Sequence, residues 1–383
     1  MNWLSEVFKL NPAGLNWPRA VGFLDVVLVP LVVFWAIGHE QYLLSAIFGV
    51  LFVALADPGG SIANREWRSA VYAAIGAGVT ALAFGIGGDA WGWLVLATFA
   101  VTVAAGLTVM FGVHRFVAAL LLNIWFIIAI GLAVSFHQYA HITSYTWAQV
   151  VSWVGGAALW LALTFIGWLV RGRRDRPQPF AELPGDTSRR ELTRAIVMFA
   201  VIRALALAGG VALAFGLNLS YGSWLPIAII IAMKPSLEQA TVVSLQRLAG
   251  ALIGAGVAAL LLLIPANEHG LRLFTITRGL EVVAIVLLTN AVAIRFWNYA
   301  IYCGGIAAAV LIMLDLWQPS NYGAEGYRVL WTLCGVGIGV LVMILAGLLG
   351  KLTAKTPPQQ SPDVPEPRKP SVSRQPRSAS SGS

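Results

Sequence analysis

Apolar runs about as long as a lipid bilayer is thick follow one another along this chain, separated by short polar breaks. A helix that spans a membrane needs about 20 mostly apolar residues. Hydrophobic residues make up 58% of the 383 residues and charged residues only 11%, whereas a soluble domain carries about 25% charged residues. The sequence therefore predicts an all-α polytopic membrane protein, and it excludes an ordinary globular domain.

The apolar runs predict about twelve transmembrane helices, arranged as two six-helix repeats. In the first half, the expected spans are residues 20–38, 42–56, 69–87, 91–112, 116–136 and 147–170. In the second half, they are residues 195–217, 222–233, 248–265, 279–297, 299–317 and 329–350.

An internal repeat is the main evidence for two copies of one unit. The pentapeptide Ile75–Val79 recurs unchanged at Ile253–Val257, 178 positions later. The second span of each half is short, and each ends in a charge followed by a proline, Asp57-Pro58 and Lys234-Pro235. Short or interrupted segments at matching positions of two halves are typical of a transport site, so we expect these two corners to meet in the middle of the protein.

The charge distribution predicts five segments and a topology. The linker 171–194 holds seven arginines and four acids, and loops rich in Lys and Arg stay in the cytosol. Six helices then precede the linker, which places both termini in the cytoplasm. The segments are an N-terminal interfacial segment (1–19), a first transmembrane repeat (20–170), the basic linker (171–194), a second repeat (195–350) and a disordered tail (351–383).

Basic side chains near the broken spans are the candidate anion-binding groups. Arg68 and Arg247 each open a glycine-rich helix beside a broken span, and the same residues also fit arginines that reach the lipid headgroups from helix ends. Aromatic side chains can stack on a substrate ring, although an aromatic near a helix end is also typical of a membrane-interface anchor. The candidate substrate-binding residues are Asp57, Pro58, Arg68, Trp224, Lys234, Pro235, Arg247 and Arg295.

Charges inside the expected spans form a second set of candidates, because an unpaired charge in a bilayer costs at least about 2.5 kcal/mol. Asp25 and Arg203 are 178 positions apart, the same offset as the repeated pentapeptide. We expect them to lie at equivalent depths and to form an ion pair between the repeats, which either is structural or takes part in proton coupling. Glu281 is a further charge inside a span.

Motifs of soluble enzymes are missing from the sequence. It contains no GxxxxGK[ST], HExxH or GxSxG pattern, so we expect no enzyme activity, no cofactor and no metal site. The basic residues gather in the linker and the tail, which argues for contact with the lipid bilayer and against nucleic acid. The expected partners are the bilayer and a small organic anion; a homo-oligomer or a periplasmic partner subunit is left open.

The second half resembles the fusaric acid resistance family, also called aromatic acid exporters. The family has a Trp-led apolar helix ending in proline, then a Thr and an Arg-Leu-x-Gly-Thr-x-x-Gly helix. The matching residues here are Trp224, Pro235, Thr241, Arg247, Gly250 and Gly254, with Ala251 in place of the usual Thr. Residues 295–299 (RFWNY), and Tyr327-Arg328 before a helix with Gly335, Gly337 and Gly339, are similar to later elements of the family.

The resemblance implies a multi-pass protein of the bacterial inner membrane that exports small organic, often aromatic, acids with the proton gradient. A passive organic-anion channel and a non-transporting subunit of an envelope assembly system are the alternatives. A major-facilitator transporter ranks last, because residues 57–68 lack its Gly-x-x-x-Asp-Arg-x-Gly-Arg pattern.

Overall fold

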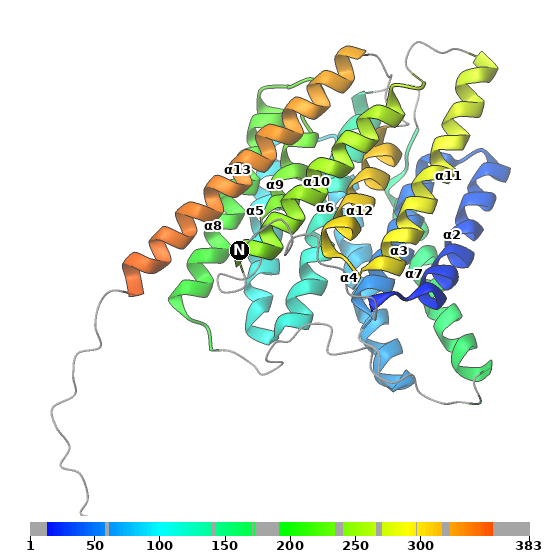
Figure 1. Cartoon of the computed structure of the whole chain (residues 1–383), viewed down its shortest axis with the longest axis horizontal. Coiled ribbons are helices and arrows are strands. Elements are labelled where there is room, and N and C mark those ends of the chain that lie inside the picture. The colour runs from blue at the N-terminus through cyan, green and yellow to red at the C-terminus, as the bar shows by residue number, and fades with distance from the viewer. Residues whose placement is uncertain are drawn as a thin grey trace, which may run out of the picture.

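Helices make up the regular structure of the described chain. The computed structural model describes residues 14–57, 61–138, 143–170, 172, 191–233, 240–265, 270–295, 297–315 and 322–354. Over these ranges the chain forms twelve α-helices and no strand (Figure 1). The first half contributes α2 (Trp17–Ile37), α3 (Leu43–Ala56), α4 (Ile62–Ile86), α5 (Trp91–Leu107), α6 (Val113–Gln138) and α7 (Thr146–Val170).

The second half contributes a further six α-helices. They are α8 (Arg194–Val211), α9 (Trp224–Ala232), α10 (Ala240–Leu262), α11 (Gly270–Ile294), α12 (Tyr299–Asp315) and α13 (Tyr322–Ala354). Short 3₁₀ turns η2 (Glu40–Tyr42) and η3 (Thr108–Phe111) precede α3 and follow α5, and a π-helical turn η4 (Ala212–Gly216) continues α8.

Local sequence signals fix several helix ends. Asn16 caps α2, since its side-chain oxygen accepts a hydrogen bond from the Arg19 backbone N–H at 3.2 Å, and Thr193 caps α8 in the same way through Ile196. α2 stops at Gly38, which adopts a left-handed conformation (φ 68°) that costs a residue without a side chain little.

Seven helices in the described part are long and apolar enough to cross a membrane. They are Trp17–Ile37, Ile62–Ile86, Trp91–Phe111, His114–His137, Thr146–Val170, Ile196–Gly216 and Leu330–Gly347. Three more apolar helices are shorter, at Glu40–Ala56, Leu252–Leu262 and Tyr299–Leu314. The chain is thus a helical multi-pass membrane protein, and the number of twelve crossings stays a prediction.

Helices α4, α10 and α11 begin seven to nine residues earlier than the apolar runs predicted. α4 begins at Ile62 and not at residue 69, and α10 begins at Ala240 and not at residue 248. The reason is that helical hydrogen bonds continue through polar turns that a hydropathy window rejects. Arg65 and Arg68 therefore belong to the first turns of α4, where we had expected a polar crossing.

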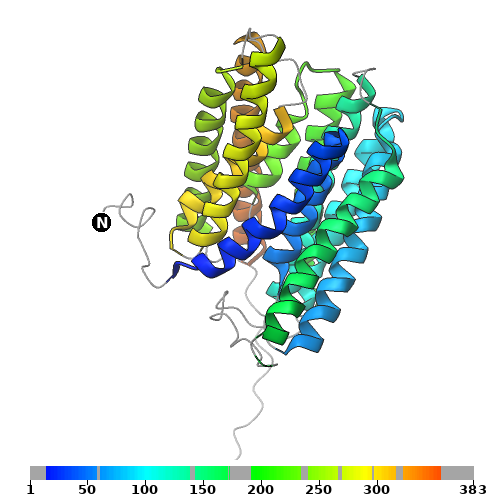
Figure 2. The same cartoon turned by 90° about the vertical axis from the view of Figure 1, so that its right-hand side faces the viewer.

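Burial separates a central group of helices from a peripheral one. Every residue from Leu43 to Leu55 of α3 is buried, and so is every residue from Trp224 to Ile230 of α9. Buried residues make up 67% of the apolar window of α6 but only 28% of that of α7. The centre of the bundle is therefore built around α3, α6 and α9, and α7 presents most of its surface outward (Figure 2).

The first helix of each half packs on a helix of the other half. α2, from the first half, packs on α11 of the second half, and α8, from the second half, packs on α5 of the first. Within each half the second and sixth helices pack together, α3 on α7 and α9 on α13. The N-terminal ends of α2 and α8 and the C-terminal ends of α7 and α13 lie at one end of the bundle, named the linker end below (Figure 1).

Candidate functional site

The buried helix α3 carries an aromatic group in the centre of the bundle. The rings of Phe48 and Trp125 lie 5.1 Å apart, and Trp125 stacks on Trp153 at 5.2 Å and 22°. Phe52 completes the group, 5.2 Å from Phe48 and 6.3 Å from Trp153. We name Phe48, Phe52, Trp125 and Trp153 the aromatic cluster.

Both indoles of the aromatic cluster are held by hydrogen bonds to α4. Trp125 donates to the Thr80 hydroxyl at 2.8 Å, and Trp153 donates to the Ala73 carbonyl at 3.1 Å. Buried indole N–H groups need such partners. The cluster is thus a set of rings fixed in orientation by the neighbouring helix.

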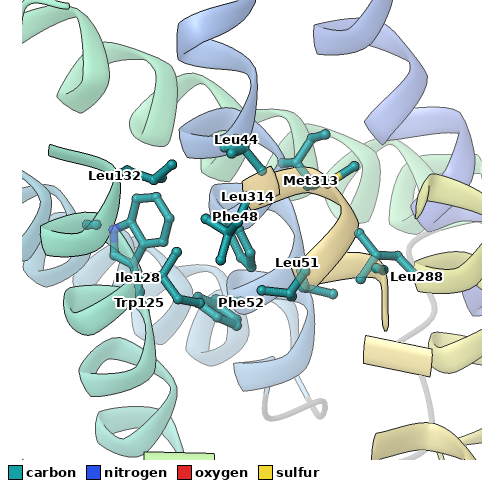
Figure 3. Close-up of a cluster of buried hydrophobic side chains, with 14 of the residues drawn as sticks. Leu44, Phe48, Leu51, Phe52, Trp125, Ile128, Leu132, Leu288, Met313 and Leu314 are labelled. Atoms are coloured by element: carbon teal, nitrogen blue, oxygen red, sulfur yellow. The ribbon is translucent and has the colours of Figure 1, made fainter. Parts of the chain in front are cut away.

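Apolar side chains close the centre next to the aromatic cluster. Figure 3 shows Leu44, Phe48 and Leu51 of α3 against Met313 and Leu314 of α12, with Ile128 and Leu132 of α6 on the other side. All of these side chains are at most 6% exposed. A packed apolar layer of this kind leaves no room for water or ions at this level of the bundle.

At the linker end, the last turn of α3 collects three arginines from three different segments. Arg19 of α2 donates to the Ala54 carbonyl, and Arg295, which follows α11, donates to the Leu55 carbonyl at 3.2 Å. Arg65 of α4 binds Asp57 through both carboxylate oxygens, with Nε at 2.5 Å from Oδ1. We name Arg19, Arg65 and Arg295 the arginine cluster.

The physical reason for the arginine cluster is the end of a helix inside protein. The last four carbonyls of an α-helix have no partner within the helix, and a helix C-terminus carries partial negative charge that cations stabilise. Asp57 and Arg65 are both only 5% exposed, so their ion pair is shielded from water and its two-point geometry matters.

At the opposite end, a cavity lies between α6, α9 and α12. Its volume is about 10 Å³, about the space that one water molecule needs. Ser135, Ser223 and Trp224 provide its polar groups. The buried indole Nε1 of Trp224 has no hydrogen-bond partner among the described residues, so an N–H donor remains available at this point.

The substrate-binding residues expected from the sequence are distributed as follows. Asp57 pairs with Arg65, Arg295 joins the arginine cluster, and Trp224 lines the small cavity at the other end. Arg68 is exposed. Arg247 lies in α10, but its side chain is outside the described part, as are residues Pro58, Lys234 and Pro235. The meeting of the two proline corners therefore stays a prediction.

The expected ion pair between Asp25 and Arg203 is wrong. Asp25 lies on the exposed face of α2 and makes no hydrogen bond or ion pair with any described residue. Arg203 is 1% exposed in α8, and its guanidinium carbon lies 5.9 Å from the centre of the Phe116 ring. The pair cannot form because α2 packs on α11 whereas α8 packs on α5. The part of either residue in proton coupling stays a prediction.

Sequence reasoning missed Arg19 and Arg65 as members of the site. Arg65 follows Asp57 by eight positions, within a polar segment that predicts a loop. In the structure Arg65 lies in α4, and its side chain reaches back to Asp57. Arg19 reaches a carbonyl 35 positions away, and nothing in a single sequence signals such a contact.

The architecture defines the class first: a helical, multi-pass membrane protein with a closed apolar centre and a basic cluster at the linker end. The sequence model of a family described as Fusaric acid resistance protein-like matches residues 194–342, from the start of α8 into α13. This part of the chain is similar to that family, and the similarity points to a membrane transport function of the efflux type. No curated protein and no solved structure matches the chain.

Proposed function

We propose that the protein exports small organic anions, including aromatic acids, through the centre of the bundle. The observation that carries this proposal is the arginine cluster at the inner end of α3, a helix buried over almost its whole length. Basic side chains on the side from which the substrate enters raise the local concentration of anions through their positive potential. The family description, which names resistance to an organic acid, supports the same direction.

The linker end is assigned to the cytoplasm, which makes the protein a bacterial inner-membrane exporter with both termini inside. The linker 171–194 carries seven arginines, and such loops remain on the cytosolic side. The arginine cluster would then meet anions before they enter the membrane. The small cavity at Trp224 would lie toward the outer face, where the indole N–H offers a donor to a leaving carboxylate.

The two halves are proposed to be copies of one six-helix unit. The matched packing of α3 on α7 and of α9 on α13 supports this, as does the exchange of first helices, α2 onto α11 and α8 onto α5. Transporters built from repeats move one bundle against the other around a central site. In this protein, opening would separate α3 from α12 at the apolar layer (Figure 3).

In the proposed cycle, an anion reaches the arginine cluster, the apolar layer parts, and the ring of an aromatic acid stacks on the aromatic cluster. The attraction between the anion and the arginine cluster is stronger than it would be in bulk water, because the local dielectric constant is low. Four rings with centres 5.1 to 6.3 Å apart give flat surfaces for an aromatic substrate. The proton gradient would supply the energy.

Uptake of radiolabelled 4-hydroxybenzoate into energised inside-out vesicles tests the proposal. Arg295→Gln removes a charge of the arginine cluster, and we expect at least about a tenfold loss of uptake, equivalent to about 1.4 kcal/mol. Arg68→Gln is the matched control, since Arg68 is exposed and lies one turn from Arg65. Wild-type uptake by a normally expressed Arg295→Gln variant would overturn the role of the cluster.

A passive anion channel is the second candidate, because an apolar layer such as that of Figure 3 is also how hydrophobic gates close channels. Collapse of the proton gradient separates the two. An exporter stops accumulating 4-hydroxybenzoate in the vesicles, whereas a channel still equilibrates it.

A further inference from the structure

A second charged group lies at the opposite end of the bundle from the arginine cluster, where α2 meets α11. Arg278 of α11 bonds Glu281 one turn later, with Nη1 at 3.0 Å from Oε2. The same guanidinium binds Glu40 in η2 through Nη2. The indole of Trp35, near the end of α2, donates to Glu281 at 2.6 Å. We name Glu40, Arg278 and Glu281 the acid–arginine triad.

Aromatic side chains flank the guanidinium of the triad, and Glu281 is buried. The guanidinium carbon of Arg278 lies 5.1 Å from the ring centre of Trp35 and 4.9 Å from that of Phe274. Glu281 is 4% exposed, and the side chains of Arg278 and Glu40 are 20% and 21% exposed. A charge imbalance here is therefore only partly screened by solvent.

The imbalance is one negative charge, since two carboxylates share one guanidinium. Two acids in one poorly solvated site do not both remain ionised with equal ease, and strongly interacting acids release their protons as a pair. The indole of Trp35 adds a hydrogen bond but no charge. Taking up one proton brings the triad to neutrality.

Among the described residues, Glu40, Arg278 and Glu281 form no ion pair with any side chain outside the triad. On the elements packed against it, α3 and α7 carry no charged residue, and Asp25 and Arg19 of α2 lie toward the linker end. The side chain of Asp315, the last residue of α12, is outside the described part. The titratable residues near the triad along the chain are His39, Tyr42 and the exposed Arg272, whereas Tyr299, Tyr302 and Cys303 open α12 at the linker end.

We propose that the acid–arginine triad is a proton-binding site in which Glu40 and Glu281 share one exchangeable proton. Its position joins the two halves, because Glu40 follows α2 of the first half and Arg278 and Glu281 belong to α11 of the second. Proton uptake weakens one of the two ionic contacts of Arg278 and so loosens α2 on α11. The use of this proton to drive export rests on the proposed function.

Infrared difference spectra of the purified full-length protein, recorded between about pH 5 and pH 8, test the site without any substrate, because ordinary exposed carboxyls titrate below this range. We expect one protonated-carboxyl band. Glu281→Gln and Glu40→Gln should each abolish it, since either change leaves a single acid balanced by Arg278. Asp89→Asn, at an exposed position of the turn between α4 and α5, is the control and should leave the band unchanged.

Two acids that titrate independently would each contribute their own part of the band, unlike two acids that share one proton. If each Gln variant removes only part of the band, or if the band survives in both, the shared site is wrong; the absence of a band from the wild type would also overturn it. Glu40 lies outside the helices, in a turn at the surface, so Glu40→Gln still decides the question if Glu281→Gln fails to fold.

Proteoliposomes then test the coupling. With a proton gradient, the Glu40→Gln variant should accumulate at least about tenfold less 4-hydroxybenzoate than the wild type. Without a gradient, the variant should still exchange this acid across the membrane. Loss of both would mean that the triad is structural and that its coupling role is wrong. If the wild-type protein exchanges none of this probe, the proposed export of aromatic acids fails, whereas the infrared result on proton binding still stands.

Discussion

The pentapeptide Ile75–Val79 in α4 and its identical copy Ile253–Val257 in α10 lie in different surroundings. In α4, Gly76 faces the indole ring of Trp153 from α7. In α10, Gly254 faces the backbone of Gly304 in α12, and Gly250 faces the Ala300 carbonyl one turn earlier. The same glycine of the repeat therefore packs against a side chain in one half and against a helix backbone in the other.

This difference shows how one repeated unit can serve two tasks. In the first half, the space that a glycine leaves holds a tryptophan of the aromatic cluster, so α4 supports the rings on which the proposed substrate stacks. In the second half, the glycines allow α10 and α12 to approach closely, as small residues do in membrane helices. Thus α4 supports a candidate binding surface, whereas α10 and α12 form a tightly packed pair.

The largest effect is expected where helix backbones touch. A methyl group at Gly254 would overlap the Gly304 carbonyl, and a backbone cannot move aside as a side chain can. We expect Gly254→Ala to destabilise the protein by about 3 kcal/mol, measured as a lower apparent melting temperature in detergent. Gly256→Ala is the control, because nothing lies within 4 Å of its added carbon. Equal melting temperatures for the two variants would contradict the close packing of α10 on α12.

A smaller effect is expected in the first half, because a ring can shift. Gly76→Ala would place a methyl group on the Trp153 indole, moving it from its stack on Trp125 and from the Ala73 carbonyl. We expect a loss of about 2 kcal/mol and a change in tryptophan fluorescence. Gly78→Ala, with open space around it, should gain up to about 1 kcal/mol. An unchanged spectrum in Gly76→Ala would remove Trp153 from the contact.

The smallest effect concerns the hydrogen bond between α4 and the aromatic cluster. Thr80→Val keeps the shape of the side chain but leaves the Trp125 indole N–H without its acceptor. We expect a loss of about 1 kcal/mol in the same melting assay, together with weaker export of 4-hydroxybenzoate. Thr80→Ser retains the hydroxyl and should behave like the wild type. A valine variant as stable as the serine variant would show that this bond does not fix the ring.

The sequence correctly predicted the helical membrane class and the similarity of the second half to the family, because apolar runs and a fixed order of Trp, Pro, Arg and Gly are local properties. It did not predict which side chains meet. Asp25 and Arg203 share the repeat offset, yet the crossed packing of α2 and α8 places them apart. The sequence shows Glu281 as a charge within a span, but Trp35, which donates to it, lies 246 positions away, and Glu40 lies 238 positions from its partner Arg278. Contacts over such separations depend on the tertiary arrangement, which periodicity does not encode.

The crossed placement of α2 on α11 and of α8 on α5 has a consequence for biosynthesis. During translation, α2 enters the bilayer long before α11 has left the ribosome, so lipid must cover its contact face until the last third of the chain arrives. The most extensive contact of each first helix is with the other half, while α2 also packs on α3 and α7, and α8 also packs on α9 and α13. Two separately expressed halves should then assemble only when made in the same cell, each completing the other.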